Sequence, residues 1–277
     1  MKIEIFEKVR EILDKEPKLI EIKKFKKIIF VGDTHGDLET SQKVIKNYLP
    51  TRNASHSDIG GKPENRIVFL GDYVDRGPFS KENIDFLLEN KLKYPNQIYL
   101  LQGNHEGYPV LKFSPADFWE SLTNKDYKLY NSIFEKLPLA LITRDIIALH
   151  GVLPDIENLS IINQIKTRSE EWHQICWGDF VEESGEYLGT DPFTGRPQFG
   201  RDYFLKLMER FNKKVLIRSH QPSSPLFMFN NKCLTIFTSS AYASERTIAI
   251  ADFKKPIKTA KDLKIKEIKN PLAEKRN

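Results

Sequence analysis

Five short polar segments of this chain carry side chains that commonly bind metal ions. They are GDTHG at 32–36, GDYVDRG at 71–77, GNHE at 103–106, HG at 150–151 and RSHQ at 218–221. Each segment follows a run of apolar residues of the kind that forms a buried strand. Their oxygen and nitrogen ligands, with no thiolate among them, suit Mn²⁺, Fe or Zn²⁺. A two-metal hydrolase of phosphate esters needs such a set, so the segments predict that type of reaction.

Six side chains in these segments are the predicted metal ligands. Asp33 and His35 are two residues apart in an extended or turning segment, so they project to the same side and can chelate one cation. Asp72 has two carboxylate oxygens and can therefore bridge two cations. The remaining ligands are one amide and two imidazoles: Asn104, His150 and His220. Two cations about 3.5–4 Å apart would hold a water between them as hydroxide, which attacks the phosphorus in line without a covalent enzyme intermediate.

Three further residues would complete the catalytic chemistry. His105 could protonate the leaving alkoxide, with Asp75 orienting its imidazole. Arg76 could donate two hydrogen bonds to phosphate oxygens. Taken alone, GDTHG could be an ordinary turn with a helix cap, and the charged residues of GDYVDRG could form a structural network of salt bridges. The occurrence of all five segments in order, each after a strand, favours the catalytic interpretation.

The elements that must position these residues alternate between strand and helix in the first half of the chain. Apolar runs predict strands at 27–31, 66–70 and 97–102, and helical spacing predicts helices at 37–48 and 80–91. Ser80 is expected to cap the second of these helices. Units of this kind build a mainly parallel sheet, and ligands collect beyond the carboxyl ends of its strands, where the polar segments fall.

The second half of the chain is richer in strands. Helical stretches at 115–137 are followed by the apolar runs LALIT, IIALH, VLIRSH, PLFMF, CLTIFT and RTIAIAD, which predict a second, mixed sheet. We expect one catalytic domain over 1–253 and a Lys-rich tail over 254–277, part of which adds an edge strand in LKIKEI. A polar stretch at 51–65 is expected to be an exposed loop, with His56 in solvent rather than on a metal.

Composition is that of a globular protein without a membrane span. The chain has 277 residues, 40% of them hydrophobic and 29% charged, and no apolar run approaches the roughly 20 residues that cross a bilayer. The N-terminal residues lack the apolar core of a signal peptide, so a cytoplasmic location is expected. The net charge of +5 is modest and concentrated after Asp252, which argues against a nucleic-acid partner. Cys176 and Cys233 lack metal-site spacing and are expected to be buried apolar residues.

These motifs resemble those of the phosphoprotein phosphatase family of serine/threonine phosphatases, within the wider calcineurin-like metallophosphoesterases. The resemblance covers roughly residues 9–252: GDTHG, GDYVDRG and GNHE correspond to the three N-terminal signatures, and LHG, RSHQ and FTSSAY to later ones. Related dinucleoside tetraphosphatases share the metal ligands but usually lack the Asp-Arg pair of GDYVDRG. The chain looks like a compact member of prokaryotic or archaeal type.

The resemblance implies a fold and a ligand assignment. The fold is an α/β architecture with a central β-sandwich of mixed sheets flanked by helices. One metal would be held by Asp33, His35 and Asp72, and the second by Asp72, Asn104, His150 and His220. His105 with Asp75 resembles the general-acid dyad of the family. Two divalent ions are therefore expected, with Mn²⁺ the ion expected in vitro and Fe or Zn²⁺ as alternatives.

The resemblance also implies the residues that bind the substrate phosphate. Arg76 resembles the first phosphate-binding arginine, and Asn104 would contribute as well. The second arginine is assigned to Arg196, although its spacing to the following Phe-Gly pair is shorter than in the family, so Arg201 remains a competitor. Tyr242 resembles a tyrosine at the rim of the active site.

The implied activity is hydrolysis of phosphoserine and phosphothreonine in proteins. The alternative is a dinucleoside polyphosphate or other nucleotide phosphoesterase that uses the same metals. A non-catalytic scaffold of the same fold is disfavoured, because such proteins usually lose ligands or the acid and this chain keeps them all. Neither a nucleic acid nor a membrane is expected as a partner, and the sequence names no regulatory subunit.

Overall fold

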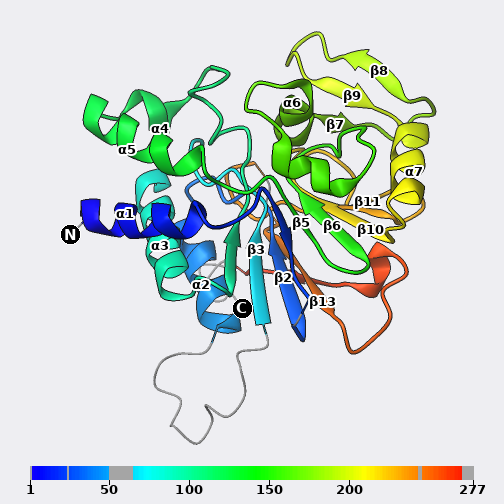
Figure 1. The fold of residues 1–277 in the computed structure, drawn as a ribbon, viewed down its shortest axis with the longest axis horizontal. Helices are drawn as coiled ribbons and strands as arrows, with labels where there is room; N and C mark the ends of the chain where they lie inside the picture. Colours follow the sequence, from blue (N-terminus) through cyan, green and yellow to red (C-terminus); the bar gives the residue numbers. More distant parts are fainter. Residues whose placement is uncertain (1, 24, 50–64, 243–244, 270–277) are drawn as a thin grey trace, which may run out of the picture.

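The computed structural model describes residues 2–23, 25–49, 65–242 and 245–269. Two mixed β-sheets are stacked on each other, and helices cover the outer face of each (Figure 1). None of the helices in these ranges is long and apolar enough to cross a membrane. The loop predicted at 51–65, with His56, lies outside the described residues apart from Asn65, which starts a strand.

The first sheet has five strands in the order β14-β13-β2-β3-β4. Its parallel part consists of β2 (Lys27–Val31), β3 (Asn65–Phe69) and β4 (Ile98–Leu100), and β13 (Thr247–Asp252) and β14 (Lys264–Glu267) add antiparallel neighbours. The strands predicted at 27–31 and 66–70 thus match β2 and β3 to within one residue. β14 forms one edge of this sheet.

Helices from the first half of the chain cover the outer face of this sheet. They are α1 (Lys2–Leu13), α2 (Leu38–Tyr48), α3 (Ser80–Lys93), α4 (Asp117–Glu120) and α5 (Asn124–Phe134). The prediction that Ser80 caps α3 is wrong. Ser80 is the first helical residue, so its hydroxyl donates back to the Gly77 carbonyl at 3.2 Å, and the capping position belongs to Phe79 without a side-chain hydrogen bond.

The second sheet has six strands in the order β1-β5-β6-β10-β12-β11. These are β1 (Leu19–Glu21), β5 (Ala140–Ile142), β6 (Ile146–Leu149), β10 (Val215–Arg218), β12 (Cys233–Thr235) and β11 (Phe227–Met228). Its outer face is covered by η2 (Leu159–Gln164), α6 (Glu170–Trp177) and α7 (Arg201–Arg210). A small third sheet consists of β7 (Asp179–Phe180), β9 (Pro197–Phe199) and β8 (Tyr187–Thr190), and η3 (Ala260–Asp262) precedes β14.

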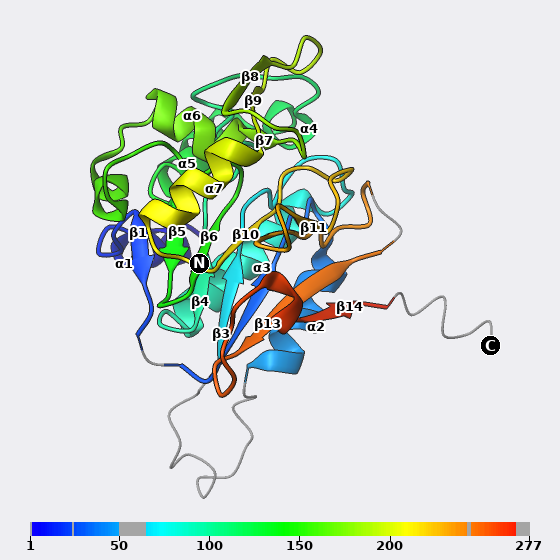
Figure 2. The ribbon, with the colours of Figure 1, turned by 90° about the vertical axis from the view of Figure 1, so that its right-hand side faces the viewer.

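An apolar layer between the two large sheets holds them together. Phe30 and Val68 of the first sheet and Ile217 and Leu234 of the second belong to one buried cluster. Because β2 and β3 are buried on both faces, their sequences are continuous apolar runs rather than alternating ones. The predicted α/β architecture of mixed sheets stacked as a sandwich and flanked by helices is confirmed, and Figure 2 shows the two sheets from the side.

A buried lysine fixes α3 to the end of β4, and its removal is expected to destabilise the fold. The Lys91 Nζ donates to Glu16 Oε1 at 2.5 Å and to the carbonyls of Ile98 and Pro95 at 2.8 and 3.0 Å. Lys91→Met is expected to lower the free energy of unfolding by about 3–5 kcal/mol, because it leaves a partly buried carboxylate and two carbonyls without a partner. Denaturant titration measures this value.

The matched control for that substitution is Lys93→Met on the same helix. Lys93 is exposed, so its replacement should change the free energy of unfolding by no more than about 0.5 kcal/mol. If both variants lost the same free energy of unfolding, the buried hydrogen bonds of Lys91 would contribute no more to stability than an exposed lysine of the same helix does.

Candidate active site

The predicted ligands meet where the carboxyl ends of strands from both large sheets come together. Asp33 and His35 follow β2, Asp72 follows β3, Asn104 follows β4, His150 follows β6 and His220 follows β10. A bridge between Asp33 and Phe237 connects the ends of the two sheets at this point. The structure therefore brings together six side chains that are spread over nearly two hundred residues of sequence.

Left-handed backbone shapes the loops of this centre. Positive φ angles occur at His35 (40°), Asp72 (53°), Asp75 (65°), Arg76 (70°) and His220 (73°). Such conformations cost about 1–3 kcal/mol each for residues other than glycine, and they persist where the surroundings hold them. Part of that hold comes from backbone hydrogen bonds, since the N–H of His35 donates to the carbonyl of Asp72 at 2.9 Å.

Glu106 fastens two of these loops to each other. Its carboxylate accepts the backbone N–H groups of Asp72, Tyr73 and Gly103 at 2.9, 2.9 and 3.0 Å. Burial, followed by the nearby Asp72, raises the pKa of Glu106 to about 7. A side chain at Gly103 would place its Cβ 2.2 Å from Asp72 Oδ1, so this position needs glycine. GNHE contains Glu106, but spacing alone gave it no role, because two of its three partners, Asp72 and Tyr73, lie more than thirty residues upstream.

Two groups of side chains offer ligand atoms that lie within 4.8 Å of one another. One group is His35, Asp72 and His105, and the other is Asp72, His150 and His220. Asp72 belongs to both, as expected for a bridging carboxylate. His105 is in the first group in place of the predicted ligand Asp33, whose Oδ2 is 3.8 Å from His35 Nε2.

Hydrogen bonds to the backbone orient two of the imidazoles. The Nδ1 of His35 lies 2.9 Å from the Val74 carbonyl, and the Nδ1 of His150 lies 3.0 Å from the Leu70 carbonyl. Because a carbonyl can only accept, each Nδ1 carries the proton and each Nε2 presents a lone pair to the centre. The Nε2 atoms of His35 and His150 lie 3.7 and 3.3 Å from Asp72 Oδ2. This is the tautomer that metal ligation requires.

The second group converges on one point. The His150 Nε2 is 3.1 Å from Asn104 Oδ1 and 3.1 Å from His220 Nδ1. All three residues are buried, with at most 3% of their surface exposed. Three such donor atoms beside a carboxylate form a ligand set of mixed oxygen and nitrogen character.

The electrostatics of the centre favour a bound cation. Burial raises the pKa of Asp33 to about 6, with His150 opposing that rise. Burial also disfavours charge on Asp72, but His150 and His105 hold its pKa well below the usual range. Although burial lowers the pKa of His150, Asp72 and Asp33 together raise it to about 9, because their negative charge attracts a positive charge to the place where a metal ion would bind.

One carboxylate oxygen in the centre supports the same conclusion. Within the described part of the chain, the buried Asp33 Oδ2 has no hydrogen-bond partner. A buried, unpaired carboxylate oxygen is costly, and a divalent ion would satisfy it. The residues present therefore fit divalent metal ions.

A His–Asp pair borders the candidate ligands. The His105 Nδ1 lies 2.6 Å from Asp75 Oδ2, and the opposite nitrogen, Nε2, lies 3.9 Å from Asp72 Oδ2. Asp75 is itself fixed, because its Oδ1 accepts the backbone N–H of Phe118 at 2.7 Å. Burial opposes protonation of His105, but Asp72 and Asp75 outweigh it and raise its pKa. The arrangement can hold a proton on the Nε2 that faces the centre.

Three of the predicted phosphate-binding residues lie around this centre. The Tyr242 ring is 5.5 Å from the His35 ring and 51% of the residue is exposed, which places it at the rim. Burial raises the pKa of Tyr242, and the positive charges of Arg76 and Arg196 oppose that rise. Arg196 also approaches Asp179, with 3.8 Å between its Nη1 and the carboxylate Oδ1.

The competing arginine has a different partner. Arg201 opens α7, and its Nη2 donates to Glu182 Oε1 at 3.0 Å. Each arginine thus has an acidic partner, so the assignment of the second phosphate-binding arginine to Arg196 stays a prediction. No motif in the sequence marks Asp179. Its neighbours are His220, which follows β10, and Arg196, which lies in the turn between β8 and β9, and only the fold brings them together.

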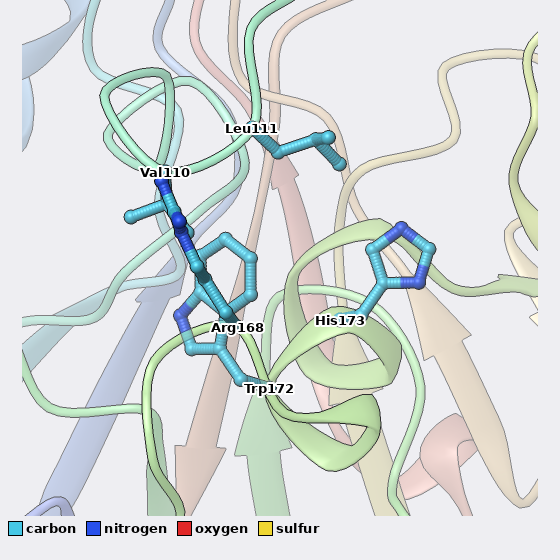
Figure 3. Close-up of a pocket in the computed structure, with 5 residues that line it drawn as sticks. All are labelled: Val110, Leu111, Arg168, Trp172 and His173. Atoms are coloured by element: carbon cyan, nitrogen blue, oxygen red, sulfur yellow. The ribbon is translucent and has the colours of Figure 1, made fainter.

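A cavity of about 440 Å³ lies between the segment after β4 and the start of α6. Aromatic contacts connect His105 to one of the residues that line this cavity: the Phe113 ring is 4.6 Å from the His105 ring and 5.5 Å from the Trp177 ring, which is 6.4 Å from the ring of His173. Figure 3 shows the five lining residues, which are Val110, Leu111, Arg168, Trp172 and His173.

Both cysteines, Cys176 and Cys233, are buried and form no disulfide, as expected.

Comparison with known proteins agrees with this architecture. The profile described as calcineurin-like phosphoesterase matches residues 26–224. The chain is 30% identical over 257 residues to "Serine/threonine-protein phosphatase 5" of Homo sapiens, an alignment that covers 87% of this chain and 49% of the human protein. The chain thus spans about half the length of that relative.

Solved structures share the fold at lower identity. A Saccharomyces cerevisiae protein serine/threonine phosphatase with similarity to human PP5 superposes with a TM-score of 0.79 and 22% identity, covering 98% of this chain and 90% of the other. A putative diadenosine tetraphosphatase superposes with a TM-score of 0.54 and 16% identity, covering 92% of this chain and 100% of the other. These two likenesses concern the fold alone.

Proposed function

Because the chain belongs to the calcineurin-like phosphoesterase family, we propose that it is a metal-dependent serine/threonine protein phosphatase. The observation that carries the proposal is the His105–Asp75 pair, with its free nitrogen 3.9 Å from the shared ligand Asp72. An alkoxide from serine or threonine is a poor leaving group, so its departure needs a proton donor at this place. The human relative supports the same substrate class.

Two divalent ions complete the proposed site. Mn²⁺ is the ion expected in vitro, with Fe or Zn²⁺ as alternatives. The first would be held by Asp33, His35 and Asp72, and the second by Asp72, Asn104, His150 and His220. When bound, such ions lower the pKa of a water and polarise a phosphoryl oxygen.

The side chains of this protein perform the remaining steps. Asp75 accepts a hydrogen bond from the Nδ1–H of His105 and stabilises the protonated imidazole, whose Nε2–H passes its proton to the leaving oxygen. Arg76 and Arg196 donate hydrogen bonds to phosphate oxygens, together with the amide of Asn104. Tyr242 borders the entrance to the site.

The proposed substrates are phosphoserine and phosphothreonine residues of other proteins. The organisation as one catalytic domain over 1–253 with a tail over 254–277, the cytoplasmic location, and the lack of nucleic-acid or membrane partners remain predictions from the sequence.

Metal removal tests the proposal. Protein stripped with a chelator should release no phosphate from a phosphothreonine peptide, and added Mn²⁺ should restore release, since Asp33 and Asp72 cannot activate water by themselves. Phosphate release is measured with and without Mn²⁺, and Mg²⁺ serves as a second arm. Activity that survives complete metal removal would contradict the proposal.

Diadenosine tetraphosphate forms the competing arm of the same experiment. The putative diadenosine tetraphosphatase shares the fold, which justifies including its substrate. The proposal predicts a higher kcat/KM for the phosphopeptide. The reverse order would assign the site to nucleotides, and no turnover of either substrate in Mn²⁺ would favour a non-catalytic scaffold.

A further inference from the structure

Asp179 lies between a predicted metal ligand and a predicted phosphate-binding residue. It is the first residue of β7 and only 7% of it is exposed. Its Oδ1 is 3.5 Å from His220 Nε2 and 3.8 Å from Arg196 Nη1. This buried carboxylate is not among the predicted metal ligands, the predicted catalytic residues or the predicted phosphate-binding residues.

The two nitrogens of His220 face different surroundings. Nδ1 points to the candidate metal group, 3.1 Å from His150 Nε2, while Nε2 points to Asp179. Among the residues that the structure describes, neither His220 Nε2 nor Asp179 Oδ1 has a hydrogen-bond partner within bonding geometry, although both are buried. Two unpaired buried atoms, one a possible donor and one an acceptor, face each other across a gap that a small movement closes.

The backbone on either side of this pair is held by a buried arginine. Arg218 donates from Nε to the Gly151 carbonyl at 2.7 Å and from Nη2 to the Gly178 carbonyl at 3.2 Å. Gly178 precedes Asp179, and Gly151 follows the ligand His150. The carboxylate is thus presented to the centre by a fixed strand end rather than by a mobile loop.

We propose that Asp179 is a positioning residue that serves both halves of the site. Its carboxylate accepts the Nε2–H of His220, which leaves Nδ1 as the lone pair that ligates a divalent ion. The same carboxylate attracts the Arg196 guanidinium and holds it toward the substrate phosphate. The inference rests on the proposed two-metal site but not on the identity of the substrate.

Two substitutions at one position separate these functions. Asp179→Ala removes both the acceptor and the charge, so the affinity for one of the two Mn²⁺ ions should fall by about 10- to 100-fold. Asp179→Asn keeps an oxygen that can accept from His220, but it removes the negative charge that attracts Arg196. The Asn variant should therefore keep most of the metal affinity and lose affinity for inorganic phosphate.

The measurements need no protein substrate. Metal-stripped protein is titrated with Mn²⁺ in competition with a chelator, and inorganic phosphate is then titrated as a ligand of the Mn²⁺-loaded protein. The matched control is Asp202→Asn, since the Asp202 carboxylate lies in the first turn of α7 and accepts the N–H of Gly185 at 2.6 Å. Its Asn variant should match the parent in both titrations.

The outcomes distinguish this inference from the function proposed above. A folded Asp179→Ala protein that binds both ions as the parent does would overturn it, as would equal effects in the Ala and Asn variants. If the Ala variant does not fold, the Asn variant still tests the link to Arg196. A lower affinity for inorganic phosphate supports that link, and an unchanged affinity contradicts it. A parent that binds two ions but hydrolyses no phosphopeptide would contradict the proposed substrate and leave the role of Asp179 standing.

Discussion

Replacing His105 by Asn should lower kcat for a phosphothreonine peptide by about 10²- to 10⁴-fold, the usual contribution of a general acid. The same variant should lose much less activity on 4-nitrophenyl phosphate, because nitrophenolate leaves without being protonated. The geometry behind this expectation is the His105 Nδ1–Asp75 Oδ2 distance of 2.6 Å, which directs the other nitrogen to the centre. Both kcat values are measured in saturating Mn²⁺.

This comparison also decides between two roles for His105. Its Nε2 is close enough to His35 and Asp72 to be a metal ligand itself. A ligand would be needed for both substrates, so equal losses would assign it to the metal and not to proton transfer. His173→Asn, a half-buried histidine outside the centre, is the control and should retain parental rates.

The substitution Asp72→Asn should abolish tight binding of both metal ions and lower kcat/KM by about 10³-fold or more. Asp72 is shared by the two candidate groups, and Lewis-acid stabilisation of several kcal/mol corresponds to roughly tenfold for each 1.4 kcal/mol. Asn is the appropriate replacement because it tolerates the φ of 53° and keeps the oxygen that accepts the N–H of His105 at 2.9 Å.

Metal content and kcat/KM are measured together on that variant. Asp202→Asn is a suitable control. Asp202 lies in the first turn of α7, and its carboxylate accepts the N–H of Gly185. An Asp72→Asn protein that retains two ions and the parental rate would contradict the bridging role.

The elements that carry the predicted ligands could be read from the sequence because of how they are buried. β2 and β3 are covered on both faces, so each is an unbroken apolar run that ends at a Gly-Asp pair. The third, small sheet gave no such signal. β8 (Tyr187–Thr190) is exposed or half-buried along its whole length, and its side chains show no alternation between buried and exposed.

The pairing of site residues was harder to predict than their presence. The spacing of ligands after strands predicts that they converge at one edge, but it does not give the contact between His105 and Asp75, thirty residues apart. The residue types suggested that pair as a general acid with its orienting carboxylate, and the family resemblance implied the same dyad. Glu106 and Asp179 remained without a role because their partners are set by tertiary packing, Glu106 on the loop after β3 and Asp179 beside His220.

The meeting of two sheets at the centre has a consequence for how the protein withstands heat. Asp33 and Asp72 come from one sheet, and His150 and His220 from the other. An ion held by residues of both sheets binds the folded chain only, so it adds about 2.7 kcal/mol to the free energy of unfolding at a free concentration of one hundred times its Kd. The melting temperature would then follow the metal supply of the surroundings, and scarcity of metal would weaken the fold together with the activity.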